Sequence, residues 1–118
     1  MSTNVLKALD DELNRLILEG KAFEALERFY DPACEMQENH EPACRGLAAN
    51  IEREQQFFAS VEKYYGGKLL SQGVGDGVTF GEWESDLQLK GGPRMIVQQT
   101  SVRRWENGKI VHERFYHK

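Results

Sequence analysis

The sequence lacks the features that mark disulfide-rich, membrane-spanning and nucleic-acid-binding proteins. Its two cysteines, Cys34 and Cys44, make no disulfide framework, and no Cys-x-x-Cys pair occurs. No apolar run approaches the ~20 residues of a membrane-spanning helix, and the acidic side chains near the start do not fit a signal peptide. The 15 Lys and Arg residues are scattered and are outnumbered by 19 Asp and Glu, which disfavours binding to phosphates. We therefore expect a cytoplasmic protein with neither a nucleic-acid nor a membrane partner.

Metal-binding and phosphate-binding motifs are missing as well. His40 lies between the two cysteines, but the spacing is not a zinc pattern and a fourth ligand is lacking. The cysteines read instead as reduced, small apolar residues. The glycine-rich run at 66–77 opens a strand rather than a helix, so it does not form a phosphate cradle. We expect no metal and no cofactor.

The first half of the chain has the spacing of amphipathic helices. Residues 4–19 place leucines at intervals of three and four, and "KAFEALERFY" repeats the pattern until Asp31-Pro32 interrupts it. A third helix is predicted from about Gly46 to Tyr65. Its buried face would carry Leu47, Ile51, Phe58, Val61 and Tyr65, and its opposite face Glu52, Arg53, Glu62 and Lys63.

The remaining residues have the pattern of a sheet. Turn signals separate predicted strands at 68–74, 78–90, 94–105 and 109–117, and an earlier strand contains residues 34–38. Asn107-Gly108 is the strongest hairpin signal, because a type I′ turn needs two residues that tolerate positive φ. Helices followed by antiparallel strands indicate one α+β domain over residues 1–118.

This order of elements resembles the nuclear transport factor 2-like superfamily, and more narrowly its SnoaL-like, polyketide-cyclase-like branch. The runs "ALERFYDPACEMQEN", "PACRGLAANIERE" and "RRWENGKIVHERFYHK" are similar to the family's first strand, third-helix start and last hairpin. The resemblance implies a cone-shaped, curved antiparallel sheet of cystatin-like topology, wrapped around three N-terminal helices and enclosing an apolar pocket. It also implies a homodimer that pairs through the sheet. It does not name the reaction, since this fold carries several chemistries.

Glu38 is the leading candidate for a catalytic residue. Relatives such as ketosteroid isomerases use an aspartate near the end of the first strand, and this chain places Gln37 or Glu38 there. Strand alternation favours Glu38, which shares a face with Cys34 and Met36. Burial among apolar groups would raise the pKa of the carboxyl and make it an effective base. The alternatives are a pocket-lining role without catalysis and a solvated position at the strand end.

Two further carboxylates are candidates for its acid/base partner. Glu82 would share a site with Glu38 or belong to an exposed carboxylate row with Glu84 and Asp86. Glu113 alternates with Val111 and Phe115 as the polar residue of a pocket wall. The predicted ligand-pocket residues are Tyr30, Met36, Phe58, Trp83, Gln99 and Phe115, of which the aromatic side chains would otherwise belong to the core and Gln99 to a dimer interface.

Two functions remain open at this stage. The first is a small cofactor-independent isomerase, cyclase or dehydratase, in which Glu38 takes a proton next to a carbonyl and Glu82 or Glu113 returns it. The second is a non-catalytic protein that binds a small apolar ligand, or a dimerising accessory domain. Two polar groups converging on one reacting atom would favour the enzyme.

Overall fold

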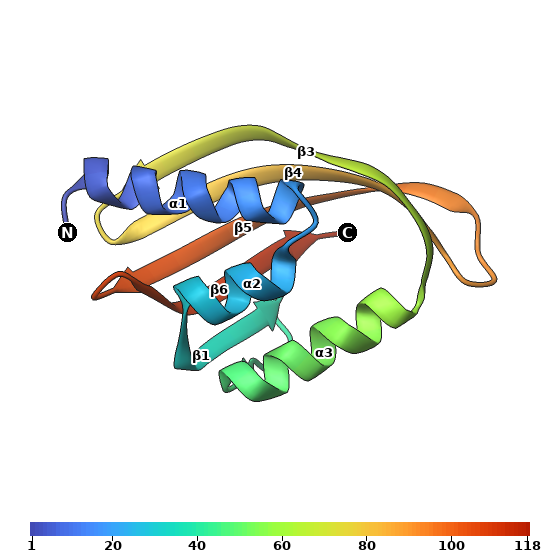
Figure 1. Ribbon diagram of the computed structural model, residues 1–118, viewed down its shortest axis with the longest axis horizontal. Coiled ribbons are helices and arrows are strands. Elements are labelled where there is room, and N and C mark those ends of the chain that lie inside the picture. The colour runs from blue at the N-terminus through green and yellow to red at the C-terminus, as the bar shows by residue number, and fades with distance from the viewer.

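The computed structural model describes residues 1–118 and contains three helices and six strands (Figure 1). In chain order these are α1 (Thr3–Leu18), α2 (Ala22–Phe29), β1 (Tyr30–Glu38), β2 (Cys44–Arg45), α3 (Leu47–Ala59), β3 (Val61–Gly75), β4 (Val78–Leu89), β5 (Arg94–Glu106) and β6 (Lys109–His117). The α+β class is therefore confirmed. None of the helices combines the length and apolar character that crossing a membrane requires.

The six strands form one sheet in the order β2-β1-β6-β5-β4-β3. Strands β3 to β6 are joined by hairpins and pair antiparallel, as predicted. Strand β1, however, pairs parallel with β6, so the sheet is mixed rather than wholly antiparallel. The reason is topological: α3 and four strands separate β1 from β6, so β1 enters beside the last strand without a hairpin.

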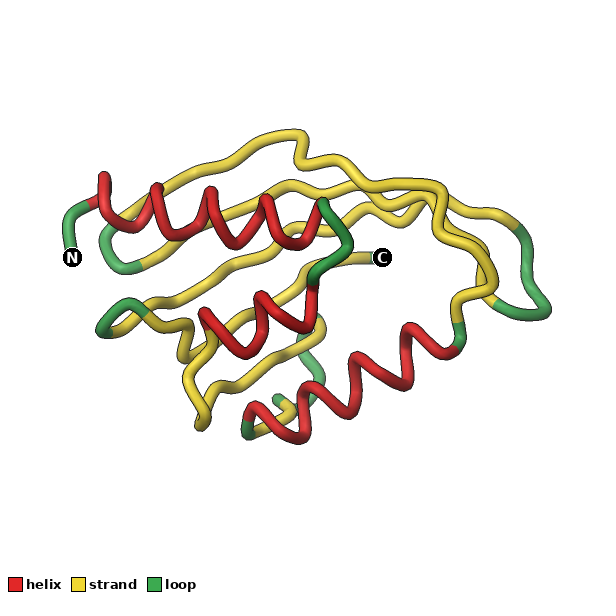
Figure 2. Tube along the Cα trace, viewed as in Figure 1, coloured by secondary structure: helices red, strands yellow, loops and turns green.

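The helices lie on the concave side of the curved sheet (Figure 1). Helix α1 packs against β3 and β4, whereas α3 packs against β1 and α2. Figure 2 shows β3 as the longest strand, bending from the end of α3 around the outside of the molecule to the far end of α1. The concave side therefore has α1 over one end and α3 near the other.

The third helix is shorter than predicted, and the prediction for residues 61–65 was wrong. Helix α3 ends at Ala59, and β3 begins at Val61. The β-branched Val61 and the aromatic Tyr64 and Tyr65 suit a strand, in which Val61 pairs with Leu89 and Tyr64 with Leu87 of β4. The apolar spacing that suggested helix here is also compatible with a twisted strand.

Local sequence signals fix the ends of the other elements. The Ser2 hydroxyl accepts a hydrogen bond from the Val5 amide at 3.1 Å and so caps α1. Asn107 and Gly108 have φ of 51° and 77°, as the predicted tight hairpin requires. The predicted Asn107-Gly108 turn is confirmed.

The apolar core joins α1 and α2 to strands β1, β5 and β6. It contains Leu6, Leu13, Leu16, Ala25, Leu26, Phe29, Tyr30, Cys34, Met36, Trp105 and Ile110. Cys34 is fully buried and Cys44 half-buried, and both are free thiols. Burial, with the nearby Glu113 charge, raises the pKa of Cys34 to about 11, which makes it a packing residue rather than a nucleophile.

Candidate functional site

Strand register decides which side chains face the helices. Trp83, Gln99 and His117 lie directly opposite one another on β4, β5 and β6. The next row joins Ser101, Phe115 and Glu38, and the row after it joins Arg103, Glu113 and Met36. Opposite residues share a face, and Met36, Ser101, Arg103 and Glu113 are buried there. Glu38 therefore lies on the concave side.

Gln37 lies on the opposite, convex side of the sheet. Its side chain bonds the Glu41 carbonyl at 3.1 Å and faces the His112 ring nitrogen at 3.2 Å. The alternation of side chains along β1, which predicted that Glu38 rather than Gln37 shares a face with Met36, thus matches the register of β1 and β6.

Glu38 binds two cationic side chains. Its Oε1 accepts a bond from Arg53 Nη1 at 3.2 Å, and its Oε2 lies 2.9 Å from His117 Nε2. These three residues come from β1, α3 and β6, and their side chains are 36%, 33% and 32% exposed, so solvent reaches them. We call Glu38, Arg53, Glu54 and His117 the concave cluster.

His117 is arranged to favour its charged form. Nδ1 faces the Lys118 carbonyl at 3.1 Å, and Nε2 faces Glu38. The Lys118 carbonyl and then Glu38 raise the pKa of this imidazole above its ordinary value, because an imidazolium can donate to both.

Glu54 has a higher pKa than an ordinary surface carboxylate. Burial raises its pKa above the ordinary 4.5, and the negative charges of Glu113 and Glu38 add to the rise, while Arg53 opposes it. Burial thus shifts Glu54 towards its neutral form, compared with an exposed glutamate, beside the Glu38–Arg53 pair. Glu38 and Glu54 therefore belong to one group of side chains.

A buried polar network around Arg103 and Glu113 lies one row of the sheet away from Glu38. Arg103 is 3% exposed and donates to Asp10 at 2.7 Å, Asn14 at 2.6 Å and Glu113 at 2.8 Å. Asp10 also accepts from Gln72 and Thr79. Although burial acts against the charge of Arg103, Glu113, then Tyr30 and then Asp10 keep the pKa of its guanidinium above the ordinary value. The network fixes α1 to the sheet.

Glu113 belongs to this network. Its Oε2 accepts from Arg103, its Oε1 accepts from the Tyr30 hydroxyl, and it is 1% exposed. Burial, and after it the Glu113 charge, raises the pKa of Tyr30 well above its ordinary value, which keeps the phenol protonated as the donor. Both oxygens of Glu113 therefore already have donors.

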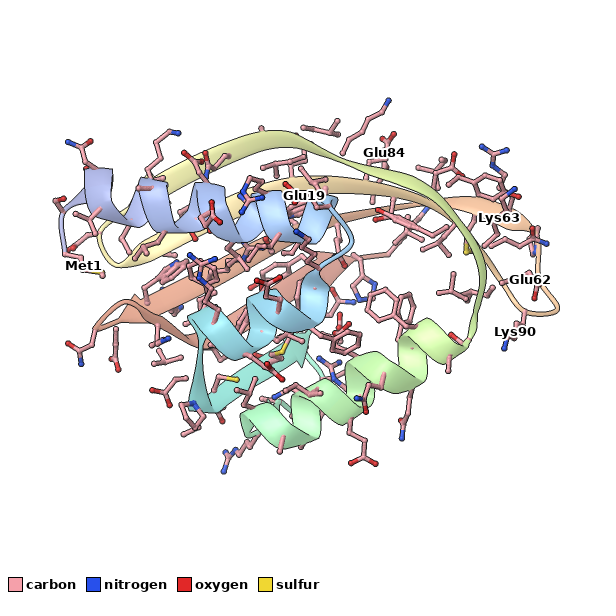
Figure 3. The ribbon with its side chains drawn as sticks, in the orientation of Figure 1. Met1, Glu19, Glu62, Lys63, Glu84 and Lys90 are labelled. Carbon is pink, nitrogen blue, oxygen red and sulfur yellow. The ribbon has the colours of Figure 1, made fainter.

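The structure separates Glu82 from the other two predicted acid/base residues. Glu82 is on the convex side, where its Oε1 accepts a bond from the Ser71 hydroxyl at 3.0 Å. Neighbouring Glu84 lies on the side of the sheet away from the helices (Figure 3), where it accepts from Gln98 at 3.2 Å. Glu82 and Glu84 thus share the convex side, as in the carboxylate row that was the alternative for this strand.

The predicted ligand-pocket residues divide between the core and the concave cluster. Met36, Tyr30 and Trp83 are 3%, 4% and 7% exposed, and the Trp83 indole donates to the Ser101 hydroxyl at 3.2 Å. Gln99 and Phe115 are half-buried and neighbour His117 and Glu38 in the rows described above. Phe58 is 45% exposed and meets Phe23 edge-on at 5.5 Å.

Sequence reasoning missed Arg53, Glu54 and His117. The sequence predicts Arg53 on the outer face of its helix, and no local pattern singles out His117. Glu54 did have a signal: it continues the helical stripe of Leu47, Ile51 and Phe58, where a carboxylate is out of place. The other two are positioned by long-range pairing that no local pattern contains.

A curved mixed sheet with three helices on its concave side is the architecture of the nuclear transport factor 2-like class. The sequence profile of the SnoaL-like domain matches residues 4–117. The chain belongs to the SnoaL-like family, as its sequence resemblance indicated. No match was found among curated protein sequences.

Solved structures share this fold at low sequence identity. A Mesorhizobium loti protein classed as a SnoaL-like polyketide cyclase superposes with a TM-score of 0.88 at 21% identity, covering 99% of this chain and 100% of its own. A Burkholderia pseudomallei NTF2-like protein of unknown function gives 0.83 at 11% identity, covering 100% and 92%. AclR from Streptomyces galilaeus, classed as a hydroxylase, gives 0.80 at 12% identity, covering 99% and 91%. At these identities the likeness concerns the fold alone.

Proposed function

We propose that this SnoaL-like protein is a cofactor-independent enzyme that moves a proton at a carbon next to a carbonyl group of a small, largely apolar molecule. The observation that supports it is the presence of two carboxyl groups, Glu38 and Glu54, in the concave cluster. Glu38 accepts bonds from Arg53 and His117, which suits a carboxylate, whereas burial raises the pKa of Glu54. We expect the enzyme to work in the cytoplasm.

In this mechanism Glu38 is the base and Glu54 the acid. A carboxylate has about four lone-pair sites, so Glu38 retains acceptor capacity beyond the bonds to Arg53 and His117. It takes the proton from the carbon, and the electron pair moves onto the carbonyl oxygen. The neutral Glu54 carboxyl donates a hydrogen bond to that oxygen as charge develops. Return of the proton to a different carbon completes an isomerisation.

Proton exchange tests the proposal without knowledge of the natural substrate. Tetralone, an apolar cyclic ketone, is incubated with the protein in heavy water, and loss of the C–H signal beside the carbonyl is followed by NMR. We expect exchange faster than in buffer, and a decrease of about 100-fold or more in Glu38→Gln. Glu84→Gln is the matched control, since Glu84 has the same chemistry on the convex side. Exchange no faster than in buffer, or an unchanged rate in Glu38→Gln, would contradict the proposal.

The second candidate is a binding protein without catalysis. It is favoured by the fact that each oxygen of Glu38 already has a protein partner, Arg53 for Oε1 and His117 for Oε2. It predicts that tetralone binds equally to the wild type and to Glu38→Gln, with no exchange above buffer in either. Binding measured by NMR titration beside the exchange rate separates the two functions.

We further propose that two copies of the chain pair through the convex side of the sheet. Leu70, Phe80, Ile96 and Tyr116 are 50%, 41%, 54% and 42% exposed, although each belongs to a strand. Phe80 borders a shallow hollow lined also by Ser71, Gly73, Gly81, Glu82 and Thr100. Acidic Glu82 and Glu84 on β4 and basic Arg104 on β5 share this side, which suits a two-fold contact between copies.

A further inference from the structure

The His117 imidazole lies between two acceptors. Its Nδ1 faces the Lys118 carbonyl at 3.1 Å, and its Nε2 faces Glu38 Oε2 at 2.9 Å. The main chain of His117 is fixed as well, because its amide donates to the Asn39 side-chain oxygen at 2.9 Å. The ring is partly exposed, so it can exchange its protons with solvent. A titratable ring is thus held against the carboxylate that we propose as the base.

Only the protonated ring can donate to both acceptors. An imidazolium carries a proton on each nitrogen, whereas a neutral imidazole carries one proton and one lone pair. If the neutral ring keeps its bond to the Lys118 carbonyl, the Nε2 lone pair faces the negative Oε2 of Glu38, and the hydrogen bond between these two atoms is lost. If the ring keeps its bond to Glu38 instead, that bond loses the assistance of the positive charge. In either tautomer the neutral ring holds Glu38 less tightly than the imidazolium does.

Among the side chains that face the ring, Glu38 of β1 is the charged one. Gln99, opposite His117 on β5, is uncharged. On α3, Arg53 binds the other oxygen of Glu38 and stays charged at every working pH. Glu54, also on α3, titrates, but loss of its proton would remove the proposed hydrogen-bond donor and so lower the rate. A rate of proton transfer that rises with pH would therefore point to His117.

We infer that His117 is a positioning residue that controls Glu38: the imidazolium holds Oε2 of Glu38, and loss of a proton from the ring frees this oxygen to act as the base. The inference rests on the proposed function, because it adds regulation by pH to the same site. Cationic donors stabilise a carboxylate and make it a weaker base, and Glu38 has Arg53 and His117 as such donors until the ring becomes neutral. The Lys118 carbonyl and then Glu38 raise the pKa of the ring above the ordinary 6.5, so the change occurs above that pH.

The pH dependence of proton exchange tests the inference. Exchange of tetralone in heavy water is followed by NMR at low ketone concentration between about pH 6 and about pH 9, and the exchange in buffer is subtracted at each pH. We expect the remaining rate to rise about 5-fold or more, with its inflection at the pH where the His117 ring signals titrate in the same samples. A rate that stays flat or falls while the ring loses its proton would overturn the inference.

Two substitutions of His117 should act in opposite directions. His117→Phe keeps a ring but donates nothing to Glu38, so the rate should be high at every pH and lose its inflection. His117→Arg keeps a cationic donor at every pH, so the rate should stay low and flat, whereas loss of a merely structural contact would lower the rate in both variants. His40→Phe is the control, because His40 is exposed and contacts Arg114 on the convex side, and its pH profile should match the wild type. Thermal melting confirms that each variant is folded, and an inflection that persists in His117→Phe would overturn the inference.

The contact itself is measured without catalysis, by NMR titration of the His117 ring. Glu38→Gln removes the negative charge beside Nε2 and should lower the pKa of His117, whereas Glu84→Gln on the convex side should leave it unchanged. An unchanged His117 pKa in Glu38→Gln would overturn the inference even if tetralone exchanges.

Failure of this inference is distinguishable from failure of the proposed function. Wild-type exchange that does not follow the His117 titration would overturn the inference and leave the proton-transfer chemistry. No exchange at any pH, together with a lower His117 pKa in Glu38→Gln, would support the contact but contradict the proposed function, and the positioning role of His117 with it.

Discussion

At the scale of single residues, the charges of this protein follow two different rules. Arg103 is buried with Asp10 and Glu113, and each of its bonds goes to a side chain of the protein. Arg53, in contrast, leaves two buried donors without partners beside a half-exposed carboxylate. The complete network around Arg103 holds α1 to the sheet, whereas Arg53 has a single partner at the surface.

Removing Arg103 should be strongly destabilising. Arg103→Met fills similar space but leaves Asp10 and Glu113 buried without a cation, so we expect a loss of about 3–5 kcal/mol in the free energy of unfolding. Urea denaturation followed by circular dichroism measures it. Arg104→Met, one residue along and exposed, is the control and should change stability by less than about 0.5 kcal/mol. Similar midpoints for the two variants would contradict a structural role for the network.

The raised pKa of Glu54 makes a prediction about stability and pH. The folded protein holds this proton more tightly than the unfolded chain, whose carboxyl has a pKa near 4.5. The resulting stabilisation is complete below that pH and is lost as the pH rises through the folded-state pKa. Glu54→Gln does not titrate, so its stability relative to the wild type should increase from pH 4.5 towards neutrality.

Urea melts of Glu54→Gln and the wild type across this range provide the measurement. The exposed Glu52 on the same helix gives the control variant Glu52→Gln, whose curve should run parallel to that of the wild type. If the free energies of unfolding of Glu54→Gln and the wild type differed by the same amount at all pH values, burial would not raise the pKa of Glu54.

At the scale of elements, β3 determines the curvature of the sheet. Its pairing with β4 shifts register between Tyr64 and Gly66 and again between Leu69 and Ser71. Gly66 has φ of 146°, a conformation that residues with a side chain rarely adopt. The strand can therefore turn from the end of α3 along the sheet without losing its pairing (Figure 2).

Alanine at Gly66 should distort this bend. We expect Gly66→Ala to lower the free energy of unfolding by about 1–2 kcal/mol, because the added Cβ meets open space and the cost comes from the backbone alone. Gly73→Ala is the control on the same strand, since it lacks positive φ and its Cβ would contact Phe80 at an ordinary 3.5 Å. Chemical denaturation of both variants tests the difference; equal losses would mean that the positive φ of Gly66 carries no cost.

The sequence predicted elements better than contacts. Helices α1 and α2, the last three strands and the Asn107-Gly108 turn follow from local periodicity and turn chemistry, and so does the side of β1 that carries Glu38. The boundary at Ala59 did not, because aromatic and β-branched residues at 61–65 fit both patterns. The partners of Glu38 were also out of reach, since Arg53 and His117 join it through a fold-wide register.

At the scale of the whole molecule, the two sides of the sheet have different tasks in our proposals. The concave side holds the core and the ligand cluster, and the convex side carries apolar residues without a partner in the monomer. A second copy would cover Leu70, Phe80 and Ile96 while leaving Glu38 and Arg53 accessible. Dimerisation and ligand binding are then separable properties.

Charge placed on the convex side should separate the copies. We expect the wild type to be a dimer by light scattering after gel filtration, and Ile96→Glu to be a monomer, because a carboxylate would be buried in the contact. Met95→Glu is the matched control: the neighbouring residue is also exposed but points to the concave side, so the variant should remain a dimer. A monomeric wild type, or a dimeric Ile96→Glu variant, would refute the proposed interface.

The parallel pairing of β1 with β6 has a consequence for folding kinetics. Tyr30 pairs with Ile110 and Glu38 with Phe115, so this pair of strands closes a longer loop than any other strand pair of the sheet. The hairpins β3–β4, β4–β5 and β5–β6 need only short loops and can assemble first. Residues of the concave cluster come from β1, α3 and β6, on both sides of that closure. The site is therefore a late product of folding, and a chain whose hairpins have formed but whose ends have not met would have a sheet without any place to bind a ligand.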